Sequence, residues 1–476
     1  MSKYVWRPQP RQLIMQSRGE DEGFYGGAAG GGKSDYLVIE ALRQYKIPCY
    51  RGLILRKSVP ELEQLVERAE EYYKAMCPNL KFNATKNTFT FPSGAKIKFG
   101  SLYRPQDKTK YQGKQFDFIG FDELTHFTYE EYIYLKSRNR ANGAGTKVYM
   151  RATGNPGGVG HGWVKQYFVT AGKPGETIWE QVEVNDPDGK KIKFWTSRVF
   201  IPSSVFDNPI LLANDPDYLK RLASMPEAER NALLYGDWNS FSGQVFTEFK
   251  NDPKHYKDKR FTHVIEPFRI PWGWKIIRSM DWGYTRPFSV GWWAVDNDGI
   301  YYRIKEYYGC QPKSPNTGVE KSYDEVALDI KQIENNDENL KGRKIIGVAD
   351  PAIFTEQGSG TSISAGMQKY GVYFQKGDNS RLAGKMQYHH RLAFDKNGIA
   401  MLYVFNTCKD FIRTIPNLVY SEKNVEDIDT DGEDHIYDES RYAIMMNVIN
   451  PRRNFLQPKH EYNPLDINND IFKIVR

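Results

Sequence analysis

A glycine-rich loop near the start of the chain limits most strongly what this sequence can fold into. Residues 27–34 read GAAGGGKS and fit the pattern G-x-x-x-x-G-K-[ST] in full. Phe24-Tyr25 ends a predicted strand before the loop, and a helix is predicted after it, over 34–45. Such a loop lets backbone N–H groups converge on an anion at the helix N-terminus. The pattern therefore predicts an α/β domain that binds the phosphates of a nucleotide.

Two acids further along the chain complete this predicted site. Asp122 and Glu123 directly follow the apolar run Phe118–Phe121, which predicts a buried strand. We expect Lys33 to reach the β- and γ-phosphates, Ser34 and Asp122 to bind Mg²⁺, and Glu123 to polarise the attacking water. A glutamate directly after the Mg²⁺ aspartate favours a hydrolysing motor over a kinase.

Two further segments add candidates of lower specificity. Thr153 and Asn155, in the sequence ATGNP at a strand end, are placed to sense the γ-phosphate; the alternative is an ordinary N-P-G turn. Gln12, ahead of the loop, is a candidate for adenine contact or an ordinary surface glutamine. The predicted nucleotide-binding residues are Gly27, Gly30, Gly31, Gly32, Lys33, Ser34, Asp122, Gln12, Thr153 and Asn155.

The second half of the chain places acids at the ends of predicted elements. Asp281 and Asp350 each end an apolar strand, and Asp438 lies in the first turn of a helix that begins near His435. A convergent carboxylate cluster is what two Mg²⁺ or Mn²⁺ ions need for in-line cleavage of a phosphodiester. The alternative is that these aspartates form turns and cap helices. Glu306 is a further candidate acid, whereas the run 426–433 is expected to be a solvated loop.

Composition and pattern set the remaining expectations. The 476 residues contain 40% hydrophobic residues, enough for two or three globular domains, and the net charge of +7 suits a protein that touches a polyanion. Nothing in the first residues resembles an export signal. The four cysteines lie far apart and are expected to be reduced thiols of a cytosolic protein. Residues 208–246 are expected to be mainly helical, with a domain boundary near 240–260.

Taken together, these motifs resemble the large terminase subunit of tailed bacteriophages. The likeness rests on the loop at 27–34, on YQGKQFDFIGFDELTHF at 111–127, on ATGNPGG at 152–158, on DNP at 207–209 and on LLYGDWNSFSGQVF at 233–246. It continues with MDWGYTRPFSVGW at 280–292, GVADPA at 347–352 and DHIYDESRY at 434–442. The order and spacing of these segments are more specific than any one of them.

The resemblance implies a two-domain α/β architecture. It implies an N-terminal P-loop ATPase of the ASCE type over 1–245, with a helical linker subdomain near 208–245. An RNase H-like nuclease over 255–450 and a polar tail over 451–476 would follow. Asp281, Asp350 and Asp438 match the nuclease metal ligands, with His435 and Asp434 as further candidates. Family members often donate an arginine to a neighbour's ATP; Arg56, Arg104, Arg138 and Arg140 are candidates, and none stands out.

The resemblance also implies an activity and partners. The activity would be ATP-driven translocation of double-stranded viral DNA into a procapsid, with metal-dependent endonucleolytic cutting of concatemeric DNA. ATP, Mg²⁺ for the ATPase and two Mg²⁺ or Mn²⁺ ions for the nuclease would be required. The partners would be the portal protein, the small terminase subunit and other copies in a ring, although the free chain could be a monomer. The expected location is the host bacterial cytoplasm, transiently at the portal vertex, and not the mature virion or a membrane.

Two other classes of function fit parts of the pattern. A DNA-repair helicase fused to a nuclease would need a second motor domain, and the residues after 245 carry strand-end acids instead. A DNA-binding scaffold with an inactive P-loop is disfavoured by the complete set Lys33, Ser34, Asp122 and Glu123.

Overall fold

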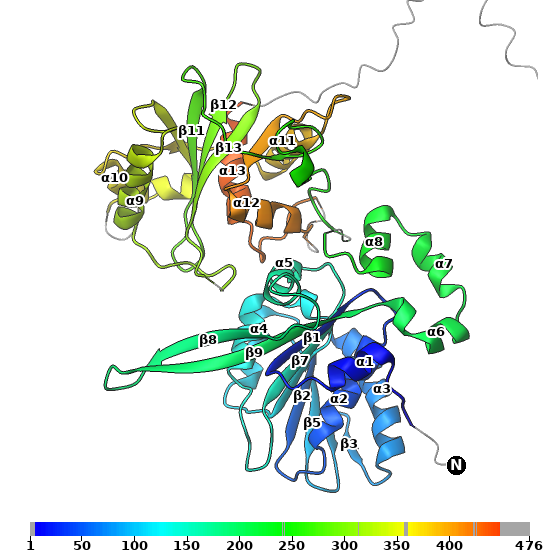
Figure 1. Cartoon of the computed structure of the whole chain (residues 1–476). Coiled ribbons are helices and arrows are strands. Elements are labelled where there is room, and N and C mark those ends of the chain that lie inside the picture. Colours follow the sequence, from blue (N-terminus) through cyan, green and yellow to red (C-terminus); the bar gives the residue numbers. More distant parts are fainter. Residues whose placement is uncertain are drawn as a thin grey trace, which may run out of the picture.

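The chain forms two lobes, each built around its own β-sheet (Figure 1). This computed structural model describes residues 5–239, 241, 243–312, 314–356, 360–421, 424 and 426–447. The predicted polar tail, 451–476, lies outside the described residues. No described helix is long and apolar enough to cross a membrane.

The first lobe contains a nine-stranded sheet in the order β3-β4-β5-β2-β6-β7-β1-β9-β8. Its six central strands, from β5 to β9 in this order, run parallel, while β3, β4 and β8 pair antiparallel at the two edges. β7 lies between β1, which leads into the glycine loop, and β6, which ends at the two acids. This interposed strand is the arrangement of the ASCE type. The strands are β1 (Glu22–Gly27), β2 (Arg51–Arg56), β3 (Lys81–Asn83), β4 (Thr88–Thr90), β5 (Lys96–Ser101), β6 (Phe118–Phe121), β7 (Tyr149–Gly154), β8 (Ile178–Asn185) and β9 (Lys191–Ser203).

Separate apolar cores cover the two faces of this sheet. One core includes α2 and α3, and the other includes α4 and α5. Three short helices, α6 to α8, form a small cluster of their own beside the sheet. The helices of the first lobe are α1 (Pro10–Gln16), α2 (Lys33–Glu40), α3 (Val59–Met76), α4 (Tyr129–Lys136), α5 (His161–Val164), α6 (Pro209–Asn214), α7 (Tyr218–Ala223) and α8 (Glu227–Tyr235).

The second lobe contains a seven-stranded mixed sheet in the order β10-β16-β13-β12-β11-β14-β15. β11, β12 and β13 form an antiparallel meander, and β14 and β15 continue the sheet parallel to β11. This is the RNase H-like arrangement. The strands are β10 (Val264–Ile265), β11 (Lys275–Asp281), β12 (Ser289–Val295), β13 (Tyr301–Tyr308), β14 (Ile345–Ala349), β15 (Gln375–Lys376) and β16 (Leu402–Phe405).

One helix of this lobe, α13, packs across β11 and β12 and also contacts β14. It runs behind the sheet in Figure 1, and its N-terminal end carries the candidate residues His435 and Asp438. The helices of the second lobe are α9 (Tyr323–Asn336), α10 (Ile363–Gln368), α11 (Arg381–Leu392), α12 (Lys409–Thr414) and α13 (His435–Met445).

Candidate functional site

The glycine loop adopts a conformation that only glycine accepts easily. Gly27, Gly30 and Gly32 have φ values of 134°, 74° and 67°. A Cβ on Gly32 would lie 2.5 Å from Nε2 of Gln12. Lys33 is buried, its Nζ donates to the carbonyl oxygen of Ala28 at 2.5 Å, and burial lowers the pKa of this amine. The loop thus folds over a buried, desolvated lysine.

Asp122 lies at the centre of the polar contacts next to this loop. Oγ of Ser34 donates to both its carboxylate oxygens at 3.1 and 3.2 Å, and Oγ1 of Thr153 donates at 2.6 Å. Arg56, at the end of β2, forms an ion pair with the same carboxylate. The structure therefore brings together side chains from four separate segments, and three of them were predicted for the site.

Glu123 takes a strained backbone position beside Asp122. Its φ is 55°, in the left-handed region that non-glycine residues rarely adopt. Asn155 donates to its carboxylate from both the backbone N–H and Nδ2, each at 3.0 Å. The predicted water-polarising glutamate and the predicted sensor are therefore in direct contact.

Two polar side chains support the loop from outside. Nε2 of Gln12 donates to the carbonyl oxygen of Gly32 at 2.7 Å, and Gln12 is buried, so the alternative of a surface glutamine is wrong. Its proposed contact with adenine stays a prediction. Asn208, in the DNP segment, donates from Nδ2 to the carbonyl oxygen of Gly30 at 2.8 Å. No spacing rule relates Asn208 to a loop so distant in sequence, so only the resemblance drew attention to it.

The carboxylates of the second lobe meet at one end of its sheet. Asp281 is the last residue of β11, and Asp350 directly follows the neighbouring parallel strand β14. The backbone N–H of Asp350 donates to the carbonyl oxygen of Met280 at 3.1 Å. Burial raises the pKa of Asp281 to about 6, and the charges of Asp438 and Asp350 act in the same direction. Asp350 also accepts from the N–H of Ala352 at 2.9 Å, so the predicted capping role is present beside any catalytic one.

The N-terminal end of α13 supplies the other candidates. Nδ1 of His435 lies 3.3 Å from Oδ2 of Asp281, and Nε2 lies 2.9 Å from Oδ1 of Asn316. Asp434 is buried, and this burial raises the pKa of its carboxyl. Nη1 of Arg381 lies 3.0 Å from both carboxylate oxygens of Asp438. Asp438 is thus already neutralised by a cation from α11.

A buried ion pair fixes the position of α13 on the sheet. Glu439, which is fully buried, accepts from Nη1 of Arg303 at 2.7 Å, from Oγ of Ser289 at 3.1 Å and from Nε1 of Trp293 at 3.2 Å. Sequence reasoning missed this residue, because an acid next to Asp438 reads as an exposed helix position.

Oxygen donors of this kind fit the chemistry of hard divalent cations. Asp281, Asp350 and Asp438 are the residues that would hold such ions. Within the described part of the chain, however, no group of three or more His, Cys, Asp or Glu side chains is close enough to hold a metal ion. Both carboxylate oxygens of Asp438 are instead in contact with Arg381.

The structure gives the contacts of two further groups of acids. Glu306 accepts from the backbone N–H groups of Asp410 and Phe411 at 2.8 and 3.1 Å, so it caps α12. The run 426–433 is a loop, yet it is not simply solvated: Asp427 pairs with Arg381, and Glu433 pairs with Arg413. All four cysteines are free thiols, as expected.

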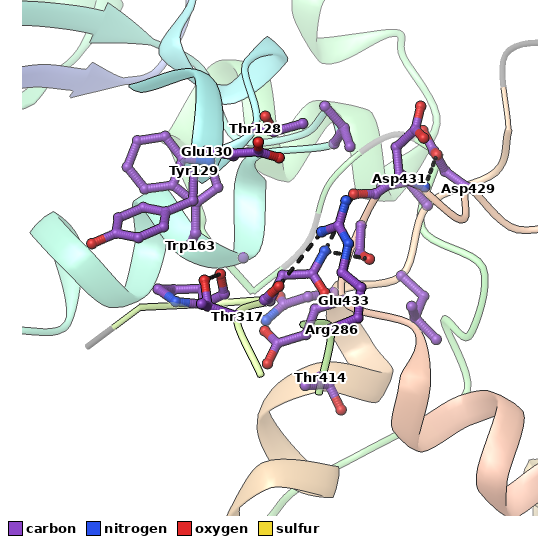
Figure 2. A pocket seen from close by; sticks show the side chains of 18 of the residues that line it. Thr128, Tyr129, Glu130, Trp163, Arg286, Thr317, Thr414, Asp429, Asp431 and Glu433 are labelled. Atoms are coloured by element: carbon purple, nitrogen blue, oxygen red, sulfur yellow. Dashed lines mark hydrogen bonds between the residues drawn. The ribbon is translucent and has the colours of Figure 1, made fainter. Parts of the chain in front are cut away.

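A pocket of about 580 Å³ lies between the two lobes, beside the candidate carboxylates of the second lobe (Figure 2). Thr128, Tyr129 and Trp163 line it from the first lobe, and Arg286 and Glu433 line it from the second. Glu433 directly precedes the candidate Asp434, so the first lobe covers one approach to the carboxylates.

A comparison with protein-family models finds a match to the first half of the chain. Residues 24–251 match the family model described as "Terminase large subunit, T4likevirus-type, N-terminal". No curated protein matches the chain.

Solved structures of large terminases cover most of the chain at low similarity. The large terminase of a thermophilic bacteriophage shares 18% identity over 93% of this chain and 100% of its own, with a TM-score of 0.38. The large terminase of bacteriophage HK97 shares 12% identity over 92% of this chain and 94% of its own, with a TM-score of 0.44. The nuclease domain of the P22 large terminase shares 19% identity over 43% of this chain and 92% of its own, with a TM-score of 0.32. Because these scores are low, the fold assignment rests on the strand order. The family match over 24–251 shows that this region of the chain belongs to the N-terminal domains of T4likevirus-type terminase large subunits.

Proposed function

We propose that this chain is an ATP-driven motor that moves double-stranded viral DNA into a procapsid and cuts concatemeric DNA with its second lobe. The assignment as a motor rests on one observation. Side chains from separate segments meet beside the glycine loop, and they are Lys33, Ser34, Asp122, Thr153 and the Glu123–Asn155 pair. A DNA-binding scaffold would not need a glutamate held in a strained position next to the Mg²⁺ aspartate.

Each part of the first site has a separate task in the proposed reaction. Lys33 and the loop amides bind the phosphates, and Mg²⁺ held by Ser34 and Asp122 supplies charge neutralisation. Glu123 accepts a proton from the attacking water, and Asn155 orients Glu123. Loss of the γ-phosphate changes what Asn155 contacts, and this change reaches the rest of the lobe.

The proposed nuclease uses Asp281, Asp350 and Asp438, with His435 and Asp434 as further candidates. Divalent cations held there would supply the cleavage of phosphodiester bonds. The partners are the viral DNA, the portal protein, the small terminase subunit and further copies of this chain in a ring at the portal vertex. The work takes place in the host cytoplasm. DNA would be held mainly through its phosphates, so translocation should depend on salt and little on sequence.

The motor is tested by ATP hydrolysis in the wild type, Lys33→Ala and Glu123→Gln. We expect Lys33→Ala to lose nucleotide binding, and Glu123→Gln to bind ATP while hydrolysing it at least ~100-fold more slowly. No turnover by the wild type, with DNA and partners present, would favour the inactive scaffold. Strand separation of a forked duplex would favour the repair helicase.

The nuclease is tested by plasmid cleavage with Mn²⁺ or Mg²⁺, with EDTA as the control. We expect metal-dependent cutting that Asp281→Asn abolishes. Cutting that persists in Asp281→Asn would show that the carboxylates were wrongly assigned, and would leave the motor assignment untouched.

A further inference from the structure

We propose that His161 couples the nucleotide site to the segment that joins the two lobes, so that the second lobe responds to bound ATP. This inference rests on the proposed binding of ATP at the first site. The joining segment, residues 236–249, is called the linker below. The hydrogen bonds of His161 go to Gly157 and Trp238, neither of which is proposed to bind ATP, so it is a positioning residue.

On one side, His161 holds the loop that carries the sensor. Its Nδ1 accepts from the backbone N–H of Gly157 at 2.9 Å, two residues after Asn155. Asn155 in turn holds Glu123, and its carbonyl oxygen accepts from Oγ1 of Thr125 at 2.9 Å. A displacement of Asn155 when the γ-phosphate leaves therefore reaches His161 through one short loop.

On the other side, the same ring holds the linker. Because Nδ1 accepts a hydrogen bond, the proton lies on Nε2, which donates to the carbonyl oxygen of Trp238 at 3.1 Å. The imidazole also stacks on the ring of Phe241, with centroids 4.1 Å apart, and on that of Trp238 at 5.2 Å. His161 is fully buried, and burial lowers its pKa to about 3, so this tautomer persists at neutral pH.

The linker then enters the core of the second lobe. The N–H of Val245 donates to the carbonyl oxygen of Leu418 at 2.9 Å, and Val245 and Phe246 are both buried in that core. The ring of Phe246 lies 5.6 Å from that of Tyr437, which directly precedes Asp438 on α13. The contacts of the described residues therefore lead from the nucleotide site to the linker, and from the linker to the helix that carries Asp438.

Hydrogen–deuterium exchange of the full chain, with and without AMP-PNP and Mg²⁺, tests the coupling. In the wild type we expect the nucleotide to slow exchange in the glycine loop and the strand and helix that flank it, residues 24–40, and to alter exchange across the linker. In His161→Phe, which keeps an aromatic ring and removes both hydrogen bonds, we expect the loop to stay protected and the linker response to be lost.

Three variants separate coupling from a structural role. The amide of Asn can replace Nδ1 in the hydrogen bond to Gly157, and the amide of Gln can replace Nε2 in the hydrogen bond to Trp238. His161→Asn and His161→Gln therefore each keep one of the two hydrogen bonds, and each should lose the linker response. Trp163→Phe is the matched control: it removes a hydrogen bond from α5 to the carbonyl oxygen of Phe127 and leaves the linker contacts in place. This control should behave as the wild type.

Each outcome decides the question. If His161→Phe fails to fold, His161→Asn and His161→Gln decide instead, because each removes one of the two hydrogen bonds. A linker response that survives in these variants, or is absent from a wild type whose loop is protected, overturns the coupling. A wild-type loop that the nucleotide does not protect overturns the proposed function itself.

Discussion

The contact between Asn155 and Glu123 shows how strongly the nucleotide site of the first lobe depends on single residues. It gives Glu123 two hydrogen bonds at 3.0 Å, one from its backbone and one from its side chain. Asn155→Asp keeps the shape and replaces the side-chain donor with a carboxylate, which repels Glu123. We expect ATP hydrolysis to fall at least ~10-fold with nearly unchanged ATP affinity, because misplacing a general base costs part of its ~100-fold or larger contribution. Steady-state hydrolysis and equilibrium binding would measure the two effects; an unchanged turnover would show that Asn155 does not orient Glu123.

Arg381 is a second single residue with a large expected effect, because it contacts the carboxylate of Asp438 that is proposed to bind metal. It donates to both oxygens of Asp438, so a divalent cation must displace it to use that carboxylate. We expect Arg381→Gln to bind Mn²⁺ more tightly than the wild type in calorimetric titrations. Lys385→Gln is the control, because Lys385 lies on the same helix and donates to the carbonyl oxygen of Glu426 instead. Weaker binding by Arg381→Gln would mean that the arginine orders the site for metal.

Two buried histidines predict how stability depends on pH. Burial lowers the pKa of His161 to about 3 and that of His263 to about 4, whereas an unfolded histidine titrates near 6.5. The unfolded chain therefore binds more protons below pH 6.5, and the free energy of unfolding falls as pH falls. The loss at pH 5 is about 2 kcal/mol for each histidine. Denaturant unfolding of His161→Phe should show a shallower dependence between pH 7 and 5, and an equal slope would contradict the neutral, buried state.

At the scale of elements, the regular strands and helices were largely predictable. The predicted strand 118–121, the strand that ends at Asp281 and the helix that begins near His435 appear as β6, β11 and α13. The helix predicted over 34–45 appears as α2, which ends at Glu40 and continues as a 3-10 helix to Gln44. Periodicity identified them because each buries one face or a whole apolar run. α12 was missed because it is short, and β8 and the outer part of β9, up to Trp195, were missed because their side chains stay largely exposed.

The two sites were predictable to different degrees. A local motif identifies Lys33 and Ser34, and a strand-end pattern identifies Asp122 and Asp281. Gln12, Arg381 and Glu439 were not assigned their contacts, because each acts on a segment far away in sequence. Such roles depend on tertiary packing, which no spacing along the chain encodes.

Gly236 directly follows α8 and lies against the glycine loop. A substitution there can be compared with the same substitution at an open position. The φ of Gly236 is 68°, and an added Cβ would lie 2.7 Å from the backbone nitrogen of Ala28. Gly175 has a φ of 81° and open space around it. We expect Gly175→Ala to lower the free energy of unfolding by about 1 kcal/mol, from backbone strain alone. Gly236→Ala should cost clearly more and weaken ATP binding, because the loop must shift; equal costs in chemical denaturation would contradict this.

At the scale of the whole molecule, the linker belongs structurally to both lobes. Trp238 and Phe241 contact the first lobe, while Val245, Phe246 and Phe249 are buried in the core of the second. The boundaries drawn at 245 and 255 stay predictions, and fragments can test them.

We expect a second-lobe fragment that begins at residue 241 to unfold cooperatively. A fragment that begins at residue 251 lacks three core side chains and should be less stable by on the order of 5 kcal/mol, since each buried side chain contributes roughly 1.5–3 kcal/mol. Thermal and denaturant unfolding of the two fragments would measure the difference. Equal stabilities would place the boundary after Phe249.

The β8–β9 ribbon reaches well beyond the body of the first lobe (Figure 1). Its base is fixed, since Arg198 pairs with Glu180 at 2.5 Å and stacks over Tyr167, while its turn at Asp186–Gly189 is closed by local hydrogen bonds alone. Eight residues of strand extend about 26 Å. In the motor proposed above, a fluorescent tag inserted at the turn of this ribbon would convert small rotations of one subunit into displacements large enough to follow optically.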